Sequence, residues 1–246
     1  MEELFLKTRD NISVAINYFN EGHNQVIIIA PGWCMTKDSK SFSELANAFR
    51  KDFDVVSMDF RGHGKSSGFF TFTAKELYDI DAVIEFVKDK YEKIYLLGFS
   101  LGGGLVLNYA AQNHGINKVI AVSPYSDFNK IENKMWKKEA WGETFKKFEL
   151  MRFLSIRPSI IPYKKLKPID LVENIKSPVL FIAGKKDPTV LPWHTEKLYK
   201  KAKCPKAFRL YDNGIHAEDI FLYNRDNFMN TCLSWLKEEN AAIQQA

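Results

Sequence analysis

The stretch YEKIYLLGFSLGGGLVLNYAA, residues 91–111, contains the pattern that decides the fold. Residues 94–97 are β-branched, aromatic and apolar, and they predict a buried strand. From residue 101 onward the apolar side chains recur at helical spacing, which predicts a helix. The chain must therefore turn sharply from a strand into a helix, and this turn falls at Ser100.

Ser100 lies between two glycines, Gly98 and Gly102, in the pattern G-x-S-x-G. The glycines remove the Cβ atoms that would clash in so sharp a bend, and the pattern is typical of a nucleophilic serine held on a strained elbow. A Gly-rich helix start can also bind phosphate or simply pack closely, so these five residues leave the alternatives open. The run Gly102-Gly103-Gly104 lacks the P-loop and dinucleotide-site spacings, which favours close packing of the helix.

The bulk composition indicates a soluble globular protein. The chain has 246 residues, of which 46% are hydrophobic and 26% charged, and we expect one α/β domain over residues 1–246. No apolar run approaches the roughly 20 residues of a membrane span, and the N-terminal MEELFLKTRD does not resemble a signal peptide. Cys34, Cys204 and Cys232 are far apart and predict no disulfide framework. These features favour a cytoplasmic protein with reduced thiols.

Short apolar runs alternate with amphipathic stretches, which is typical of a mostly parallel sheet covered by helices. The runs ELFLKT and ISVAINYF predict an opening antiparallel hairpin. Further buried strands are predicted at QVIIIA, DVVSMDF, KIYLLGFS, KVIAVSP, PVLFIAGKKD and KAFRLYDN. Helices are predicted around residues 41–50, after a Thr73-x-x-Glu76 capping box, after Ser100, and as one closing helix over residues 221–236.

One connection, between the strands KVIAVSP and PVLFIAGKKD, is much longer than the others. From Pro124 to Pro168 it far exceeds the minimum of about 10–12 residues for a crossover. Residues 125–167 hold nine lysines, two arginines and five acidic residues, a net charge of +6 against +5 for the whole chain. We expect a small cap, inserted between strands 6 and 7 over the carboxyl edge of the sheet. A decorated surface helix is the alternative.

Three polar residues with complementary chemistry follow predicted strands. Ser100 ends KIYLLGFS, Asp187 follows VLFIAGKK, and His216 follows FRLYDNG. In an open α/β sheet the chemistry gathers at the carboxyl ends of the strands. A serine hydroxyl becomes a strong nucleophile when a neutral imidazole takes its proton, and a carboxylate fixes the histidine tautomer. The order serine, acid, histidine therefore predicts a catalytic triad.

Four motifs, GFSLGG, DFRGHGKSSG, PVLFIAGKKDPTV and YDNGIHAED, occur in this order over nearly the whole chain. With them the sequence resembles the α/β hydrolase superfamily, and within it the monoglyceride-lipase-like and feruloyl-esterase-like (serine aminopeptidase-like) serine hydrolases. The resemblance implies an α/β-hydrolase fold, a mostly parallel central sheet flanked by helices, and no metal or cofactor. It also implies that His63 lies in a structural loop, with Asp59 and Arg61 as hydrogen-bonding struts.

Two other aspartates compete with Asp187 for the role of the acid. Asp127 follows the strand VIAVSP, where some members of the superfamily place the acid, and Asp212 lies four residues before His216. Asp187 is favoured because it ends a buried strand and matches the family position. Asp212 is expected to support the turn before Gly214.

An oxyanion hole needs two backbone N–H groups aimed at the developing negative charge. One is expected from Leu101, the residue after the nucleophile. The resemblance implies that Trp33, in the loop after VIIIA, supplies the other and presents its ring to the substrate. This loop has Pro31 where relatives usually carry a histidine. The contacts that support the outer side of the loop are therefore expected to differ from theirs, whereas the N–H donor of Trp33 is not affected. Cys34 is interpreted as a packed thiol rather than a second nucleophile.

The expected activity is hydrolysis of a carboxylic ester of small or medium size through an acyl-enzyme on Ser100. Thioesterase, acyltransferase, aminopeptidase and cofactor-free peroxidase chemistry are alternatives on the same residues. A non-enzymatic binding module is less favoured, because the triad is complete.

The expected partner is a small acyl substrate. A nucleic-acid surface is not expected, because the excess basic charge is confined to one segment. The basic cap would attract anionic substrates or a negatively charged membrane surface, and a merely solvated face is the alternative. The sequence leaves the oligomeric state open. The apolar inner face of the cap, which would bind the acyl chain of the substrate, is expected to include Trp136, Trp141, Phe145, Phe148 and Met151, together with Leu150 and Phe153.

Overall fold

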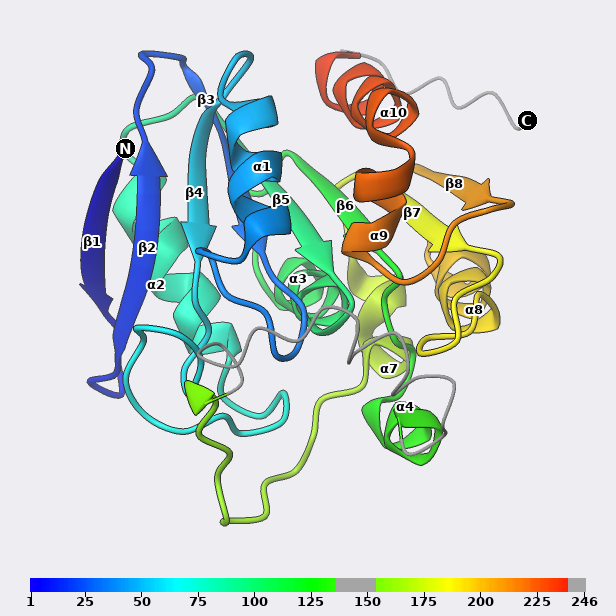
Figure 1. The fold of residues 1–246 in the computed structure, drawn as a ribbon, viewed down its shortest axis with the longest axis horizontal. Helices are drawn as coiled ribbons and strands as arrows, with labels where there is room; N and C mark the ends of the chain where they lie inside the picture. Colours follow the sequence, from blue (N-terminus) through cyan, green and yellow to red (C-terminus); the bar gives the residue numbers. More distant parts are fainter. Residues whose placement is uncertain (136–153, 239–246) are drawn as a thin grey trace.

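The computed structural model describes residues 1–135 and 154–238 of the chain, and its centre is an eight-stranded sheet (Figure 1). The strand order is β1-β2-β4-β3-β5-β6-β7-β8. The strands are β1 (Glu2–Lys7), β2 (Ser13–Phe19), β3 (Gln25–Ala30), β4 (Asp54–Met58), β5 (Lys93–Phe99), β6 (Lys118–Val122), β7 (Val179–Gly184) and β8 (Lys206–Tyr211). β2 is antiparallel to both β1 and β4, and the pairs from β4 to β8 are parallel. The predicted hairpin and mostly parallel sheet are confirmed.

Helices cover both faces of the sheet (Figure 1). They are α1 (Lys40–Phe49), α2 (Leu77–Val87), α3 (Leu101–Gln112), α4 (Phe128–Met135), α7 (Pro168–Leu171), α8 (Trp193–Lys201), α9 (Glu218–Tyr223) and α10 (Arg225–Lys237), with a 3₁₀ turn η1 (Val172–Asn174). Helices α1, α9 and α10 share one apolar core with the sheet, and α2, α3 and α8 share another. The single closing helix predicted from the sequence is wrong: Asn224 has φ −134° and ψ 41°, which separates α9 from α10.

The central strands are apolar without alternation because both of their faces are buried. In β3, Val26 and Ile28 pack into the core shared with α2 and α3, whereas Ile27 and Ile29 pack into the core shared with α1. All four side chains have no exposed surface. This is the pattern expected of a parallel sheet between two helical layers, and it explains why these strands could be predicted from continuous apolar runs.

The predicted capping box at α2 is also wrong. The helix begins at Leu77, and Thr73 is a buried residue with a φ of 81° whose hydroxyl donates to the carbonyl of Leu166. The carboxylate of Glu76 accepts instead from the backbone N–H and the hydroxyl of Thr71. The reason is the tertiary environment. Glu76 is completely buried, so its carboxylate must find hydrogen-bond donors nearby, and it finds them in the loop before α2 rather than at the end of the helix.

The order of the strands reverses in the middle of the sheet. The chain leaves β3 through α1 to reach β4, then returns past β3 through α2 to reach β5. Helices α1 and α2 pack on opposite faces of the sheet, so the direction of winding changes between β3 and β5. Ligands of open α/β sheets bind at such a switch in strand order.

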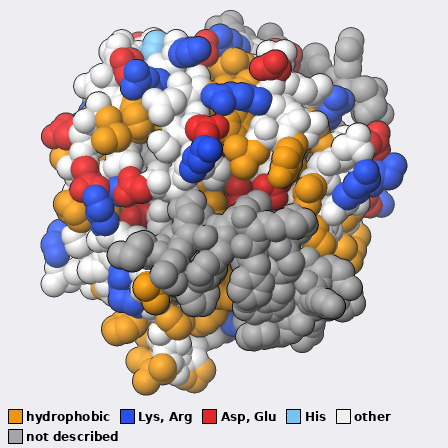
Figure 2. Space-filling model, viewed as in Figure 1, with side chains coloured by type: hydrophobic (Ala, Val, Ile, Leu, Met, Phe, Trp, Pro, Cys, Tyr) orange, Lys and Arg blue, Asp and Glu red, His pale blue; other side chains and the backbone are white. Residues whose placement is uncertain are grey.

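The long connection between β6 and β7 contains α4, the segment 154–167, α7 and η1. The residues expected to line the inner face of a cap lie outside the described part of the chain: Trp136, Trp141, Phe145, Phe148, Leu150, Met151 and Phe153. Hydrophobic side chains gather at the lower end of the face shown in Figure 2. Among the described helices, none is both long and apolar enough to cross a bilayer.

Helix α3 approaches the sheet very closely through its glycines. A Cβ atom on Gly102 would lie 2.1 Å from the carbonyl oxygen of Ala30 in β3, and one on Gly98 would lie 2.4 Å from the carbonyl oxygen of Gly102. Both obstacles are backbone atoms, so neither can rotate away. The glycine run therefore serves close packing, as the sequence indicated.

This packing yields a prediction about stability. Gly102→Ala should lower the free energy of unfolding by roughly 3 kcal/mol, because the added methyl group displaces backbone atoms of β3. In Gly103→Ala the nearest atom, the carbonyl oxygen of Val122, is 3.1 Å away. The gain in helix propensity, about 1 kcal/mol, should offset much of that smaller clash. Urea unfolding followed by circular dichroism measures both, and equal losses would contradict the close approach of Gly102.

Candidate functional site

Ser100 lies on a strained turn between β5 and α3. Its backbone has φ 50° and ψ −108°, a conformation that costs a non-glycine residue of the order of 1–3 kcal/mol. Two hydrogen bonds hold the turn: the Ser100 N–H donates to the carbonyl of Val122 at 2.8 Å, and the Gly102 N–H donates to that of Pro31 at 3.1 Å. The side chain is thereby fixed above the carboxyl edge, half-buried, between the ends of β3 and β6.

The side chains of Ser100, His216 and Asp187 form a continuous hydrogen-bonded path. The Nε2 atom of His216 lies 2.9 Å from the Ser100 hydroxyl, and its Nδ1 atom lies 2.7 Å from Oδ2 of Asp187. Because the carboxylate only accepts, Nδ1 carries the hydrogen and Nε2 is left to accept from the serine. The arrangement can remove a proton from the hydroxyl and hold the resulting positive charge beside a carboxylate.

Asp187 is held rigidly in the loop after β7. Its side chain has no exposed surface. The second oxygen, Oδ1, accepts from the backbone N–H groups of Thr189 at 2.8 Å and Val190 at 2.9 Å. One oxygen is thus used to fix the carboxylate in place, and the other is directed at His216.

His216 is positioned by a residue that the sequence reading did not single out. The next residue, Ala217, has a φ of 48°, and its N–H donates to the hydroxyl of Ser123 at 3.2 Å. Ser123 also has a φ of 48°, is completely buried, and its N–H donates to the carbonyl of Ile182. A serine directly after a predicted buried strand, in VIAVSP, was the available signal.

The loop after β3 brings Trp33 to the elbow. A Cβ atom on Gly32 would lie 3.4 Å from the Cβ atom of Ser100, so the loop and the serine are in contact. Within the described residues, the N–H groups of Trp33 and Leu101 make no backbone hydrogen bond, whereas those of Met35 and Gly102 do. The Trp33 ring is half-buried and stacks on Phe70 with their centroids 6.4 Å apart.

The two competing aspartates are directed elsewhere. Oδ2 of Asp127 pairs with the ammonium of Lys167 at 3.1 Å, and Oδ1 accepts from the N–H of Asn129. Close by, the Ile169 N–H donates to the carbonyl of Ser126, so the two ends of the β6–β7 connection are tied together. Asp212 is exposed and pairs with Lys185 at 3.0 Å.

The buried histidines outside this group are both neutral. His63 donates from Nδ1 to the carbonyl of Arg61, and burial lowers its pKa to about 4. In His194, Nδ1 accepts from both the N–H and the hydroxyl of Ser126, at 3.1 and 2.7 Å. Burial, together with the charge of Lys130, lowers the pKa of His194 to about 4.

The expected struts around His63 are present. The carboxylate of Asp59 accepts from the backbone N–H groups of Lys37 at 2.7 Å and Lys65 at 3.0 Å, and burial raises its pKa to about 6. The guanidinium of Arg61 pairs with Asp10 and Asp79 and is almost fully buried. These contacts stiffen the loop after β4.

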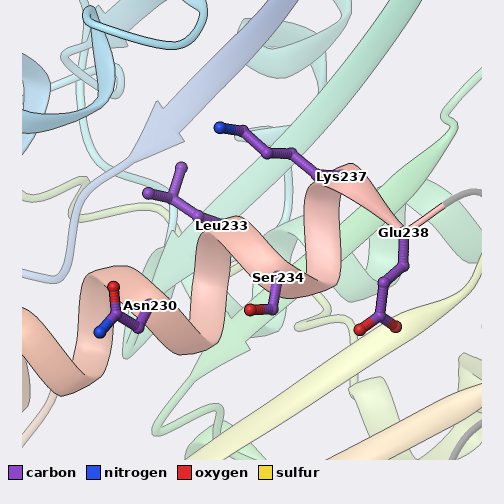
Figure 3. A pocket seen from close by; sticks show the side chains of 5 residues that line it. All are labelled: Asn230, Leu233, Ser234, Lys237 and Glu238. Atoms are coloured by element: carbon purple, nitrogen blue, oxygen red, sulfur yellow. The ribbon is translucent and has the colours of Figure 1, made fainter.

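A shallow hollow lies on α10, away from these groups, and is lined by Asn230, Leu233, Ser234, Lys237 and Glu238 (Figure 3). Leu233 and Lys237 point to one side of the helix and Glu238 to the other, so the side chains do not converge (Figure 3). The buried ammonium of Lys118, at the amino end of β6, donates to the carbonyl of Trp235 at 2.6 Å. The hollow is therefore at the end of the sheet opposite Ser100.

Comparisons with known proteins agree with this fold. A family model described as the alpha/beta hydrolase fold matches residues 25–149, just over half of the 246-residue chain. The structure of the esterase Pf2001 from Pyrococcus furiosus superposes with a TM-score of 0.79 at 21% identity and covers 96% of this chain and 91% of that one. At such identity the likeness is one of fold.

Two curated bacterial proteins are similar in sequence. The uncharacterized protein YqkD of Bacillus subtilis is 27% identical over 197 residues, covering 78% of this chain and 64% of that protein. The uncharacterized protein YfhR of Escherichia coli O157:H7 is 30% identical over 204 residues, covering 77% and 64%. The chain thus spans less than two thirds of the length of these relatives.

The lowered pKa of His194 leads to a prediction of pH-dependent stability. Between about pH 6.5 and 4 the unfolded chain binds a proton that the folded His194 does not, so stability falls as the pH falls. The variant His194→Gln keeps an acceptor for Ser126 but does not titrate. From pH 7 to 5 the wild type should lose about 1–2 kcal/mol more unfolding free energy than this variant.

Urea unfolding at pH 7, 6 and 5 measures the difference. His114→Gln is the control, because His114 is exposed and its loss should leave the wild-type pH dependence unchanged. Parallel curves for the wild type and His194→Gln would show that His194 is protonated in the folded protein.

Proposed function

This chain belongs to the α/β hydrolase fold family, and from its site geometry we propose that it is a serine hydrolase acting on carboxylic esters of small or medium size. The observation that carries the proposal is the path from the Ser100 hydroxyl through His216 to Asp187, with contacts of 2.9 and 2.7 Å. The path ends at a hydroxyl on a strained elbow, where an acyl group can reach it.

In the first half of the proposed reaction, Nε2 of His216 takes the proton of the Ser100 hydroxyl as its oxygen bonds to the acyl carbon. The π electrons of the carbonyl move onto its oxygen, which becomes the oxyanion of a tetrahedral intermediate. Asp187 stabilises the imidazolium, which then protonates the leaving alcohol as the carbon–oxygen bond breaks. The acyl group is left as an ester of Ser100.

In the second half, water takes the place of the alcohol. His216 removes a proton from the water as the water oxygen bonds to the acyl carbon, and the π electrons of the carbonyl move onto its oxygen. The bond between the acyl carbon and the Ser100 oxygen then breaks as the carbonyl re-forms, and the imidazolium returns its proton to Ser100. The products are a carboxylic acid and the free enzyme. The supporting observation is that Nε2 of His216 faces the serine while Nδ1 is held by Asp187. The same nitrogen, Nε2, can therefore transfer the proton in both steps.

We assign the oxyanion hole to the N–H groups of Trp33 and Leu101. Leu101 is the first residue of α3, directly after the nucleophile, and the loop carrying Trp33 touches the elbow through Gly32. Neither N–H group is engaged by a backbone carbonyl within the described residues. Two preorganised donors of this kind typically contribute about 3–4 kcal/mol each to the transition state.

The preference for esters rests on the similarity to Pf2001, which is named an esterase, and is part of the proposal. Thioester, acyl-transfer, amide and peroxidase chemistry would use the same three residues. We further propose that residues 1–246 form one domain and that residues 125–167 are its cap. The excess charge of +6 in this segment would attract anionic acyl substrates.

Ser100→Ala tests the nucleophile. It should abolish labelling by a fluorophosphonate probe and lower the turnover of p-nitrophenyl esters by about 10⁶, because no hydroxyl remains to form the acyl-enzyme. The melting temperature should not fall. Turnover within tenfold of the wild type would reject Ser100 as the nucleophile, whereas a wild type without turnover or labelling would favour a binding module.

Substitution of the three aspartates tests the acid. Asp187→Asn should lower turnover by roughly 10⁴, because an amide at this position favours the wrong histidine tautomer. Asp127→Asn and Asp212→Asn are matched controls that break only the pairs with Lys167 and Lys185, and each should change turnover less than about tenfold. A larger loss at Asp127 than at Asp187 would move the acid to the end of β6.

A further inference from the structure

The segment of residues 154–167, which we call the arm, runs along the loop after β4. Its Arg157 exchanges hydrogen bonds with that loop: the Arg157 N–H donates to the carbonyl of Gly62 and the Phe70 N–H donates to the carbonyl of Arg157, both at 2.8 Å. The Ser159 N–H donates to the carbonyl of Phe70, also at 2.8 Å. These contacts fix the arm at the carboxyl edge of the sheet, the edge that bears Ser100 (Figure 1).

Two large apolar side chains project into solvent where the arm turns. Ile160 is 98% exposed and Ile161 58%, and we call these two residues the tip. The turn itself is braced, because the Ser159 hydroxyl accepts from the N–H of Ile161 at 3.1 Å and faces its carbonyl oxygen. The arm runs at the lower end of the molecule in Figure 1, where Figure 2 shows hydrophobic side chains gathered. Exposed apolar groups in a fixed turn point to a partner.

The sequence of the arm is basic. It contains Arg157, Lys164, Lys165 and Lys167 and no acidic residue, and of these Lys167 pairs with Asp127 where the arm rejoins the sheet. The guanidinium of Arg157 donates to backbone carbonyls, among them that of Ser155 at 2.8 Å, so these contacts leave its charge unneutralised. Lys164 is exposed two residues after an exposed proline. On the neighbouring loop, the ammonium of Lys75 lies 5.0 Å from the ring of Tyr163 in the arm.

We propose that the tip and the cations of the arm dock this protein on an anionic phospholipid surface. A short apolar insertion flanked by lysines and an aromatic side chain suits the boundary between headgroups and acyl chains. Negative headgroups complement the cations, each of which strengthens binding by about fivefold. A second copy of the same patch would instead bring like charges together, which opposes self-association through this face.

Docking in this way fixes the orientation of the molecule. Since the tip and Ser100 lie at the same edge of the sheet, the bilayer faces the mouth of the proposed site. Lipid binding itself needs neither Ser100 nor turnover, so it can be tested separately from the proposed hydrolase activity.

The test is flotation of the full chain with vesicles of phosphatidylcholine alone or mixed equally with phosphatidylglycerol. The wild type should bind the mixed vesicles and lose affinity as salt is raised from about 0.1 to 0.5 M. Ile160→Ser/Ile161→Ser should weaken binding at least about tenfold, because two apolar side chains no longer insert. Lys164→Gln should weaken it roughly fivefold, because Lys164 is the exposed lysine of the arm.

Matched controls change the same residue types elsewhere. Phe5→Ser removes a 53% exposed apolar side chain from the edge strand β1, and Lys176→Gln/Lys200→Gln removes two exposed cations. Both controls should bind like the wild type. Circular dichroism melting should be unchanged for Ile160→Ser/Ile161→Ser and for Lys164→Gln, because the three substituted side chains are exposed.

Three results would overturn the proposal. The first is a wild type that stays with the solvent in the presence of mixed vesicles. The second is equal binding by the wild type and the Ile160→Ser/Ile161→Ser variant. The third is a wild-type dimer by light scattering that this variant converts to a monomer, without vesicle binding, since the tip would then be a contact between two copies.

Discussion

The approach of α3 to the sheet, close enough that a Cβ atom on Gly102 would overlap the backbone of β3, is the constraint on which the candidate site depends. It places the first turn of the helix against the ends of β3 and β5 and forces Ser100 into a backbone conformation with positive φ. The hydroxyl is then directed out of the sheet edge, and the N–H of Leu101 lies at the start of the helix. A looser helix would leave the serine on an ordinary turn.

Ser100 is one of three residues near the site with a strained, positive φ, and hydrogen bonds at the end of β6 connect the three. Val122, the last residue of β6, accepts the hydrogen bond from the Ser100 N–H. Ser123, the next residue, accepts from the N–H of Ala217, which follows His216. Ser100, Ser123 and Ala217 all have φ near 50°. A strand that contributes no member of the Ser-His-Asp path therefore sets the distance between two of them, and residues in strained conformations commonly gather at functional sites in this way.

The sequence allowed the sheet and the three polar residues to be predicted, for a physical reason. Strands such as β3 are buried on both faces and show continuous apolar runs, and in a parallel sheet the residues after such runs must meet at one edge. The turn before α2 and the role of Ser123 depend on contacts between distant segments, such as those of Thr73 with Leu166 and of Ser123 with Ala217. Glu76 bonds to Thr71 only because the loop around it is buried, and no local pattern contains that information.

The base of the β6–β7 connection has an evolutionary consequence. The pair between Asp127 and Lys167, and the hydrogen bond from Ile169 to Ser126, close the connection where it leaves and rejoins the sheet. The described part of the connection is attached at this base and, through Arg157 and Ser159, at the loop after β4, and the strands on either side are paired independently of it. Insertions, deletions and exchanges of sequence beyond this base can accumulate without disturbing the elbow. Relatives can therefore diverge in what they recognise while the chemistry at the sheet edge stays the same.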